Sequence, residues 1–414
     1  MRIVLWHGYL LGGTGSNVYT RALAREWSNA GNDVVVVCQE RSPERFDIGA
    51  ATVVVPELPN GLLPVFVMDR YAGLAPKLLQ DWTAAERDAY VAVNAAAIRE
   101  QLPADLVFAN HVLMGGPVGA ASGAPFRVKA HGSELEYSMR GRPELEALGR
   151  EALARAELTF VGSQHIRDVL EHVVGHVDRV LEVPPGVDVD EFVPEGRDVA
   201  LEKLVAESSA DPPNPGNTQE RLPDEGNADR LAAFLTGDTP TVVYVGKLID
   251  QKGVHVLLDA MRGLDARLVV AGFGPARLGL EADSAPLTLF TGALEHRHLR
   301  HLFALADVAV VPSIFPEAFG MVAAEAAAAG APPLVARHSG LAEVAAGLEE
   351  EYPDRLRHLA SFATGDALDL RAKLVDVIAL SASDRDELRS AARRAVVERW
   401  SWAGVAARLV APAG

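Results

Sequence analysis

Two glutamates eight residues apart flank a predicted junction between a loop and a helix. The apolar run 307–311 is typical of a buried parallel strand. The alanine-rich stretch 319–329 carries no helix breaker and ends at Gly330, followed by two prolines, which predicts a helix. Glu317 then lies in the loop, and Glu325 lies about two turns further on the helix.

The start of this helix is suited to bind an anion. Unpaired backbone N–H groups and the positive end of the helix dipole converge there. The glutamates on either side can only accept hydrogen bonds when ionised, so they suit hydroxyl groups. A ligand with phosphates in the middle and hydroxyls on both sides fits this arrangement, and a nucleotide sugar has that layout.

Two lysines add positive charge to this picture. Lys247 and Lys252 follow the predicted strand 241–245 and are five residues apart across a loop. Both can converge on a diphosphate and offset the charge that develops on a leaving group. Surface lysines are usually only solvated, so the pair gains meaning from the two glutamates.

These segments resemble a known family. The run from Glu317 to Glu325 resembles the Glu-x7-Glu signature of retaining glycosyltransferases of family 4, which have the GT-B fold. Residues 245–254 resemble that family's Gly-Arg-Leu-x4-Lys-Gly segment, with lysine where arginine is commoner. Shorter likenesses to its His-Gly-x-Asp/Glu and Asn-Gly-Val-Asp elements are found at 131–134 and 185–188.

The resemblance implies a metal-independent, retaining transfer of a sugar from a nucleoside diphosphate sugar to an acceptor hydroxyl, with no cofactor. Glu325 would accept hydrogen bonds from the ribose, and Glu317 from the transferred sugar. His131 would stabilise or orient the sugar near its anomeric carbon, with a capping or core role as its alternative. The other residues implied to hold the donor are Gly272, Phe273 and Gly274 near the base, and the backbone of Phe319, Gly320, Met321 and Val322 at the phosphates.

A glycine cluster after the first predicted strand has three interpretations. It includes Gly12 and Gly13 and opens a helix. The favoured interpretation is contact with the donor diphosphate; the others are a structural turn and a dinucleotide site. The last one lacks the third glycine of the dinucleotide pattern, because Val18 stands in its place.

Some tempting motifs have plainer explanations. Asp188 and Asp190 look like a metal-binding pair but belong to the Gly-Val-Asp loop. The run 296–301 has three histidines and is interpreted as an exposed helix, not a metal site. Glu134 is interpreted as a first-turn helix carboxylate, with acceptor contact as the alternative. Cys38 ends an apolar run and is expected to be a core thiol.

The alternation of strands and helices predicts an α/β protein with two Rossmann-like, doubly wound parallel-sheet domains, which the GT-B resemblance places around a central cleft. The expected domains are 1–190, with the last helix (about 395–414) packed back on it, and 236–394, which binds the donor. Residues 198–230 hold four prolines and eight acidic against three basic residues, which predicts a mobile, solvated insertion.

Composition bounds the partners. The net charge of −17 argues against a nucleic-acid partner. The short apolar start and the lack of a long apolar run predict a cytoplasmic protein without a membrane span, while peripheral membrane contact is left open. The acceptor is unknown. Two alternatives remain: a GT-B epimerase or phosphorylase acting on a similar donor, and a catalytically silent sugar-nucleotide-binding protein.

Overall fold

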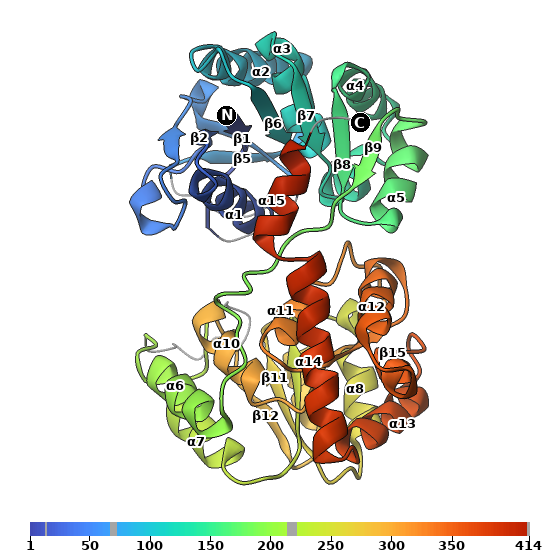
Figure 1. Ribbon diagram of the computed structural model, residues 1–414. Helices are drawn as coiled ribbons and strands as arrows, with labels where there is room; N and C mark the ends of the chain where they lie inside the picture. The colour runs from blue at the N-terminus through green and yellow to red at the C-terminus, as the bar shows by residue number, and fades with distance from the viewer. Residues whose placement is uncertain (13–14, 67–72, 213–221, 412–414) are drawn as a thin grey trace. The chain divides into compact units, whose positions relative to one another are not determined.

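A computed structural model describes residues 1–12, 15–66, 73–212 and 222–411 of the 414-residue chain. The chain forms two compact units, each built around its own parallel sheet (Figure 1). Unit 1 comprises Met1–Gly186 with Trp402–Gly414, and unit 2 comprises Val187–Ser401. The predicted α/β class with two Rossmann-like sheets is confirmed.

The sheet of unit 1 has seven strands in the order β3-β2-β1-β6-β7-β8-β9, and every neighbouring pair is parallel. The chain builds outward from β1 in one direction and from β6 in the other. The junction between β1 and β6 is therefore a topological switch point, where ligands bind beyond the strand ends in such sheets. The strands are β1 (Arg2–Trp6), β2 (Asp33–Val37), β3 (Thr52–Val54), β6 (Leu106–Asn110), β7 (Phe126–Lys129), β8 (Leu158–Val161) and β9 (Val180–Glu182). A separate parallel pair consists of β4 (Leu62–Val65) and β5 (Ala75–Leu78).

The helices of unit 1 follow from amphipathic patterns with clear end signals. In α5 (Gln164–Val174) the apolar residues at 166, 169, 170, 173 and 174 form one buried face. Ser163 caps its start by accepting from the Ile166 N–H at 3.3 Å, and Gly175 ends it at φ 84°. The other helices are α1 (Gly15–Asn29), α2 (Ala84–Arg99), α3 (Gly116–Ser122), α4 (Pro143–Arg155) and α15 (Trp402–Val410).

Unit 2 repeats the plan with six parallel strands in the order β12-β11-β10-β13-β14-β15. Its switch point lies between β10 and β13. The strands are β10 (Thr241–Val245), β11 (Arg267–Ala271), β12 (Thr288–Phe290), β13 (Val308–Val311), β14 (Pro333–Ala336) and β15 (Ser361–Phe362). The helices are α6 (Arg197–Ser209), α7 (Asn227–Leu235), α8 (Val254–Met261), α9 (Arg277–Asp283), α10 (His296–Ala304), α11 (Met321–Ala328), α12 (Ser339–Glu351), α13 (Ala367–Ile378) and α14 (Ala382–Arg399).

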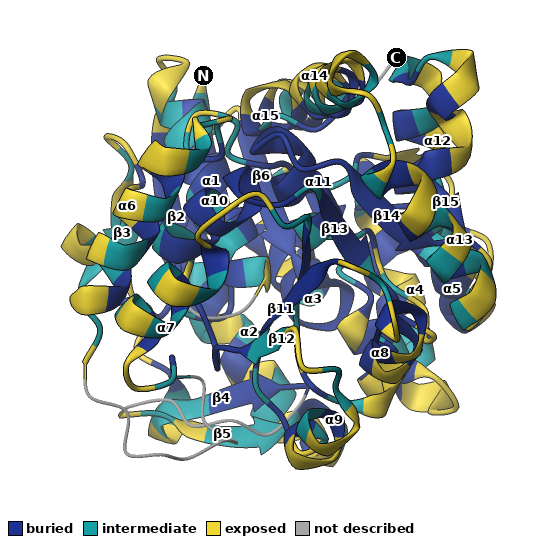
Figure 2. Ribbon diagram, turned by 90° about the horizontal axis from the view of Figure 1, so that it is seen from below, coloured by how far each residue is buried: buried dark blue, intermediate teal, exposed yellow. Residues whose placement is uncertain are grey.

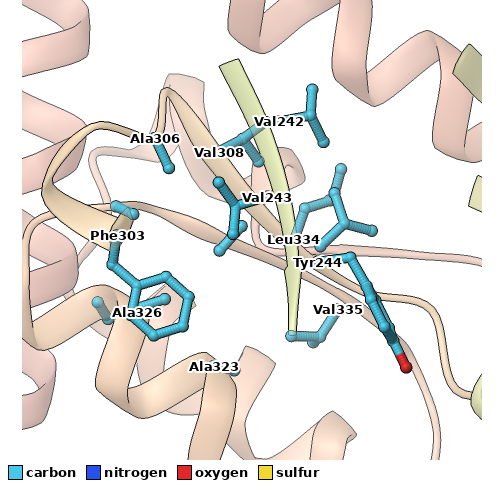
Figure 3. Close-up of a cluster of buried hydrophobic side chains, with 14 of the residues drawn as sticks. Val242, Val243, Tyr244, Phe303, Ala306, Val308, Ala323, Ala326, Leu334 and Val335 are labelled. Carbon is cyan, nitrogen blue, oxygen red and sulfur yellow. The ribbon is translucent and has the colours of Figure 1, made fainter. Parts of the chain in front are cut away.

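The core of unit 2 lies between its sheet and the surrounding helices (Figure 3). Val242 and Val308 of adjacent strands are almost fully buried, and Phe303 and Ala326 pack from the helices. The small side chains of α11 let that helix lie close to β13 and β14. Figure 2 shows central strands such as β6 and β14 buried and the outer faces of the helices exposed.

Helices stand where a mobile insertion at 198–230 was predicted. In α6, Ala200 and Leu204 are fully buried, as are Leu231 and Leu235 in α7, and all four belong to the core of unit 2. The prediction is wrong for the described parts of this segment, because four-residue apolar spacing forms a buried stripe despite the acidic average. Residues 213–221 lie outside the described residues.

The end of the chain returns to unit 1, as predicted, but later than 395. Residues 395–399 belong to α14 in unit 2, and only α15 packs against α1. Trp27 of α1 donates its indole N–H to the Ala406 carbonyl at 2.9 Å. The boundary after β9 also falls at Gly186, four residues before the expected 190.

No helix in the described part of the chain is long and apolar enough to cross a bilayer.

Candidate functional site

The loops that follow β10 and β13 bring the predicted lysine and glutamate together. Because β10 and β13 are neighbours at the switch point, these loops leave the same edge of the sheet. Lys252 ends a short 3-10 turn, and Gly253 follows at φ 65°. A Cβ on Gly253 would lie 2.0 Å from the Pro312 carbonyl oxygen, so only glycine allows this approach. The Lys252 ammonium consequently forms an ion pair with Glu317 Oε1.

Glu317 is held from several sides. Ser313 Oγ donates to Glu317 Oε1 at 2.5 Å, and the Glu317 N–H donates to Ser339 Oγ at 2.9 Å. His338 Nε2 lies 2.7 Å from the Ser313 carbonyl oxygen. The carboxylate is thus fixed at the sheet edge, beside a cation and a hydroxyl group.

Lys247 lies on the same loop system but is exposed. The Tyr244 hydroxyl donates to the Lys247 carbonyl at 2.8 Å, which fixes the backbone and leaves the side chain extended from the loop. Among the described residues Lys247 joins no ion pair. It is therefore an uncompensated cation that can meet an anionic ligand.

The helix after Glu317 begins at Met321, two residues later than predicted. Gly320 precedes it at φ 130°, and a Cβ there would come within 2.7 Å of Leu341. Phe319 is a core residue, 5.4 Å from the Trp400 ring centroid, so only its backbone can take part in the predicted phosphate site. The first N–H groups of α11 lie at the switch-point edge of the sheet, as expected for an anion site.

Glu325 lies on α11 and is 7% exposed. Burial, and secondarily the negative charge of Glu191, raise the pKa of this carboxyl to about 8. His296 Nε2 lies 3.5 Å from Glu325 Oε1. At this buried position the group therefore carries a proton near neutral pH, which the sequence did not reveal.

The glycines after β11 have a structural explanation. The Gly272 N–H donates to the Gly292 carbonyl at 2.8 Å, and the Phe273 carbonyl accepts from the Leu248 N–H at 2.7 Å. A Cβ on Gly272 would lie 1.9 Å from the Gly246 carbonyl oxygen, and Gly274 has φ 151°. The loop is thereby locked against the loop after β10. Contact of Gly272, Phe273 and Gly274 with a nucleotide base stays a prediction.

In unit 1, His131 follows β7 and is held by a neighbour at the end of β6. Its Nε2 lies 2.7 Å from Asn110 Oδ1, and its ring packs edge-on against Tyr19. Burial first, then the charges of His111, Lys129 and His7, keep the pKa of His131 well below its usual range. The imidazole is consequently neutral, so it can interact with a ligand through hydrogen bonds but not through charge.

Sequence reasoning missed two further histidines at this edge. His7 directly follows β1, and His111 directly follows β6, so both stand at the switch point of unit 1. The ring centroids of His111 and His131 are 4.7 Å apart, and those of His7 and His111 are 6.0 Å apart. The available signal was a histidine immediately after each of two apolar strands, which gains meaning only once the strand order is known.

The glycine loop of unit 1 is only partly described. Gly12 lies beside the Phe46 ring, and its carbonyl accepts from the Asn17 amide. Gly13 lies outside the described residues. Its predicted contact with a diphosphate stays a prediction, as does that of Gly12.

Glu134 is not available to an acceptor. It is fully buried, and its two oxygens accept from the N–H groups of Val112 and Leu113 at 2.7 and 2.9 Å. These belong to η4 (His111–Gly115), a π-helical turn. The carboxylate therefore caps a neighbouring turn and not the first turn of its own helix.

The other motifs are structural. Asp188 caps its own turn by accepting from the N–H groups of Asp190 and Glu191 at 3.2 and 2.9 Å. In the described residues no group of three or more His, Cys, Asp or Glu side chains is placed to hold a metal ion. The expected exposed histidine helix is wrong, because His298 and His301 of α10 are buried. Cys38 is buried, as expected, and burial raises the pKa of its thiol to about 12.

Comparison with known proteins agrees with this picture. The model of the family "Glycosyltransferase Family 4" matches residues 13–191, and that of "Glycosyl transferases group 1" matches residues 228–393. Together they cover most of both units. The chain belongs to the family 4 (group 1) glycosyltransferases.

Two curated relatives from Mycobacterium tuberculosis are similar over part of their length. A GDP-mannose-dependent alpha-(1-6)-phosphatidylinositol dimannoside mannosyltransferase is 33% identical over 190 residues, 42% of this chain. The matched part of the chain spans less than half of that relative, 45%. The corresponding monomannoside mannosyltransferase is 28% identical over 302 residues, which cover 67% of this chain and 66% of the relative.

A solved structure shows the same fold over the whole chain. Anabaena HepE, crystallised with UDP and glucose, superposes with a TM-score of 0.66 at 15% identity, covering 98% of this chain and 97% of that one. The likeness establishes the GT-B fold.

Proposed function

We propose that the protein transfers a sugar from a nucleoside diphosphate sugar to an acceptor hydroxyl, with retention of configuration. The observation that carries this proposal is the arrangement at the switch point of unit 2. Lys252, Glu317 and the start of α11 meet there, with the exposed Lys247 on the neighbouring loop. Two lysines and free helix N–H groups suit the charge that develops on a departing diphosphate.

Each side chain has a defined part in this proposal. Lys247 and Lys252 bind the diphosphate, and Glu317 accepts hydrogen bonds from the transferred sugar. Glu325 lies one helix turn from the start of α11 and accepts from the ribose hydroxyls. The neutral His131 of unit 1 orients the sugar near its anomeric carbon.

The chemistry follows from these roles. The bond between the anomeric carbon and the diphosphate breaks, and the acceptor oxygen bonds that carbon on the face from which the diphosphate departs. The leaving diphosphate takes the proton of the acceptor hydroxyl. We assign no carboxylate to a covalent intermediate, because Glu317 is given hydrogen bonds from hydroxyls of the transferred sugar in this proposal. The ion pair also means that a bound phosphate must compete with Glu317 for Lys252, which couples donor binding to the freeing of that carboxylate.

The names of the relatives suggest which kind of donor the protein uses. Two of them are named as GDP-mannose-dependent enzymes acting on phosphatidylinositol mannosides, and the matched structure holds UDP and glucose. Each of these names pairs a nucleoside diphosphate with a hexose. We propose a hexose as the transferred sugar and leave the base to experiment.

A thermal-shift panel identifies the donor. UDP, GDP, ADP and their hexose conjugates are each added to the protein, and one base is expected to raise Tm, since a ligand that binds only the folded state stabilises it. The Lys247→Ala/Lys252→Ala variant should lose this shift. A protein whose Tm responds to no nucleotide, or a double variant with an undiminished shift, would contradict the proposal.

Two other activities are separated by turnover. An epimerase would produce a new sugar isomer from the donor without any acceptor, and a phosphorylase would consume phosphate. A silent binding protein would show the Tm shift without slow donor hydrolysis. The proposal expects slow hydrolysis that releases the nucleoside diphosphate.

A further inference from the structure

The start of α10 carries a histidine whose ring faces the buried carboxyl of α11. His296 is the first residue of α10, and its Nε2 lies 3.5 Å from Glu325 Oε1. The His296 side chain is 38% exposed, whereas that of Glu325 is 9% exposed. The imidazole is therefore the more exposed partner of this pair. The Phe192 ring packs edge-on against it, with centroids 5.6 Å apart at 74°.

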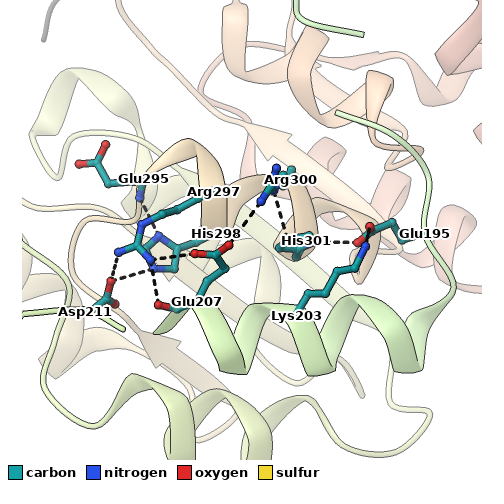
Figure 4. A network of polar contacts seen from close by, with 9 residues as sticks. All are labelled: Glu195, Lys203, Glu207, Asp211, Glu295, Arg297, His298, Arg300 and His301. Atoms are coloured by element: carbon teal, nitrogen blue, oxygen red, sulfur yellow. Dashed lines mark hydrogen bonds and ion pairs between the residues drawn. The ribbon is translucent and has the colours of Figure 1, made fainter. Parts of the chain in front are cut away.

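The position of His296 is fixed by a polar network on the rest of α10 (Figure 4). The Glu295 N–H donates to His298 Nδ1 at 3.1 Å, which closes a capping box at the helix start. Asp211, which follows α6, bonds His298 Nε2 at 3.0 Å and pairs with Arg297. One turn on, His301 Nδ1 lies 2.6 Å from Glu195 Oε2.

This network gives the histidines of the run 296–301 a structural role. The histidines at 298 and 301 anchor the helix to the segment 195–211, so the helix start is held in place without help from a ligand. A preorganised side chain loses less entropy when it engages a ligand. His296 is thus presented to Glu325 before any nucleotide arrives.

The charged groups around Glu325 leave His296 as its basic neighbour. Glu191 faces it with a negative charge, and Glu295 lies next to His296 on the chain. Arg297 and Arg300 of α10 are paired with Glu207, and Arg297 also with Asp211. Among the described residues, the basic partner within ion-pair distance of Glu325 is His296.

A ribose needs this carboxyl in its ionised form. Two hydroxyls of a diol donate to the two oxygens of one carboxylate, whereas a protonated carboxyl offers a donor of its own. Burial favours the protonated form, since it raises the pKa of Glu325 to about 8. The proton must leave when the diol binds, and the neighbouring imidazole is the base within reach.

We propose that His296 is a positioning residue of the nucleotide site, which takes the proton of Glu325 when a ribose binds. The bond between Glu325 Oε1 and hydrogen breaks, and a bond between His296 Nε2 and the same hydrogen forms, so the pair keeps its net charge. Nε2 acts as the acceptor in the tautomer whose proton is on Nδ1. This inference rests on the proposed binding of the ribose by Glu325.

The test counts protons during nucleotide binding. The nucleoside diphosphate found in the thermal-shift panel is titrated into the protein by calorimetry at about pH 7, in two buffers of different ionisation enthalpy. The native protein is expected to bind with little proton release. The His296→Gln variant must release the proton to solvent, so it should release more protons and bind about tenfold more weakly, a gap that closes above about pH 8.

A matched control lies in the same unit. His358 Nε2 is also 3.5 Å from a carboxylate, that of Asp376, but both side chains are about half exposed. His358→Gln should leave affinity and proton count unchanged. In the Glu325→Gln background, His296→Gln should have no further effect, which separates proton transfer from a merely structural role of the ring.

The outcomes distinguish the two proposals. Binding of the nucleotide by the native protein and by His296→Gln with the same affinity and proton count would overturn this inference alone. A native protein that binds no nucleoside diphosphate would overturn the proposed function together with it. An effect of His296→Gln that persists in the Glu325→Gln background would also overturn the inference.

Discussion

At the scale of single residues, the site is defined by which charges are already paired and which are free. Lys252 is engaged by Glu317, whereas Lys247 joins no ion pair among the described residues. We therefore expect a diphosphate to meet Lys247 directly and to compete with a carboxylate for Lys252. The sequence pattern treats the two lysines alike, but only Lys252 has an ion pair that a bound phosphate would have to break.

Removing Lys252 should reduce turnover more than it reduces stability. Lys252→Ala deletes a charge-assisted contact to the leaving group worth about 1.5–3 kcal/mol, so kcat/KM should fall about ten- to a hundredfold. Steady-state kinetics of donor turnover measures this. Lys373→Ala, on helix α13, which carries none of the proposed site residues, is the matched control and should turn over normally. Equal kinetics for both variants would refute the role of Lys252.

Glu325 should leave a signature in the pH dependence of stability. Its pKa is raised from 4.5 to about 8 by burial, so between these values the folded state holds a proton that the unfolded chain has released. This group makes its full contribution to the free energy of unfolding below about pH 4.5. Between that pH and about pH 8 the contribution falls by about 1.4 kcal/mol per pH unit.

Glu325→Gln removes this slope. Urea unfolding of both proteins across this pH range should show the variant gaining stability relative to the native protein as the pH rises. Parallel stability curves would show that the carboxyl is ionised in the folded state.

At the scale of elements, the parallel strands were predictable and the polar helices were not. Apolar runs such as Val242–Val245 and Val308–Val311 lie in β10 and β13, because strands buried on both faces carry few polar residues. In α6 only every fourth residue is buried, at Ala200, Leu204 and Ser208, so composition hides the pattern.

The candidate site was predictable only in part, for a related reason. Glu317, Glu325 and Lys252 were found because they lie at fixed spacings within local motifs. Strand order and helix packing bring His296, His7 and His111 to the site, and neither can be recognised from a local motif because both join residues distant in sequence. The buried environment that changes the proton occupancy of Glu325 is likewise a property of the fold.

Helix α6 should contribute measurably to stability. Leu204→Ala leaves a cavity in the core of unit 2 and should lower the free energy of unfolding by about 2–5 kcal/mol. Val199→Ala, on the exposed face of the same helix, should change it by about 0.5 kcal/mol or less. Denaturant titration of both variants tests this. A Leu204→Ala protein as stable as Val199→Ala would support the loop expected from composition.

The return of the chain to unit 1 depends on one glycine. A Cβ on Gly186 would lie 2.5 Å from the Trp402 ring and 2.8 Å from its Cα, so Gly186→Ala should displace the start of α15 and lower Tm by several degrees. Gly196→Ala is the control, because its Cβ would meet nothing within 4 Å. Thermal unfolding of the two variants decides the matter. Equal Tm values would show that α15 tolerates the displacement.

At the scale of the whole molecule, both units carry polar groups at the switch point of a parallel sheet. Unit 2 supplies lysines and carboxyls, and unit 1 supplies neutral imidazoles.

The central claim is retaining sugar transfer from a nucleotide, and one measurement tests it most directly. The sugar nucleotide found in the thermal-shift panel is incubated with the protein and excess EDTA, and the anomeric proton of the sugar product is followed by NMR together with the released nucleoside diphosphate. We expect release of the nucleoside diphosphate, a product with the donor's anomeric configuration when first formed, and loss of both signals in the Lys247→Ala/Lys252→Ala variant. An inverted first product, a new sugar isomer still attached to the nucleotide, or turnover abolished by EDTA and restored by magnesium would contradict the account.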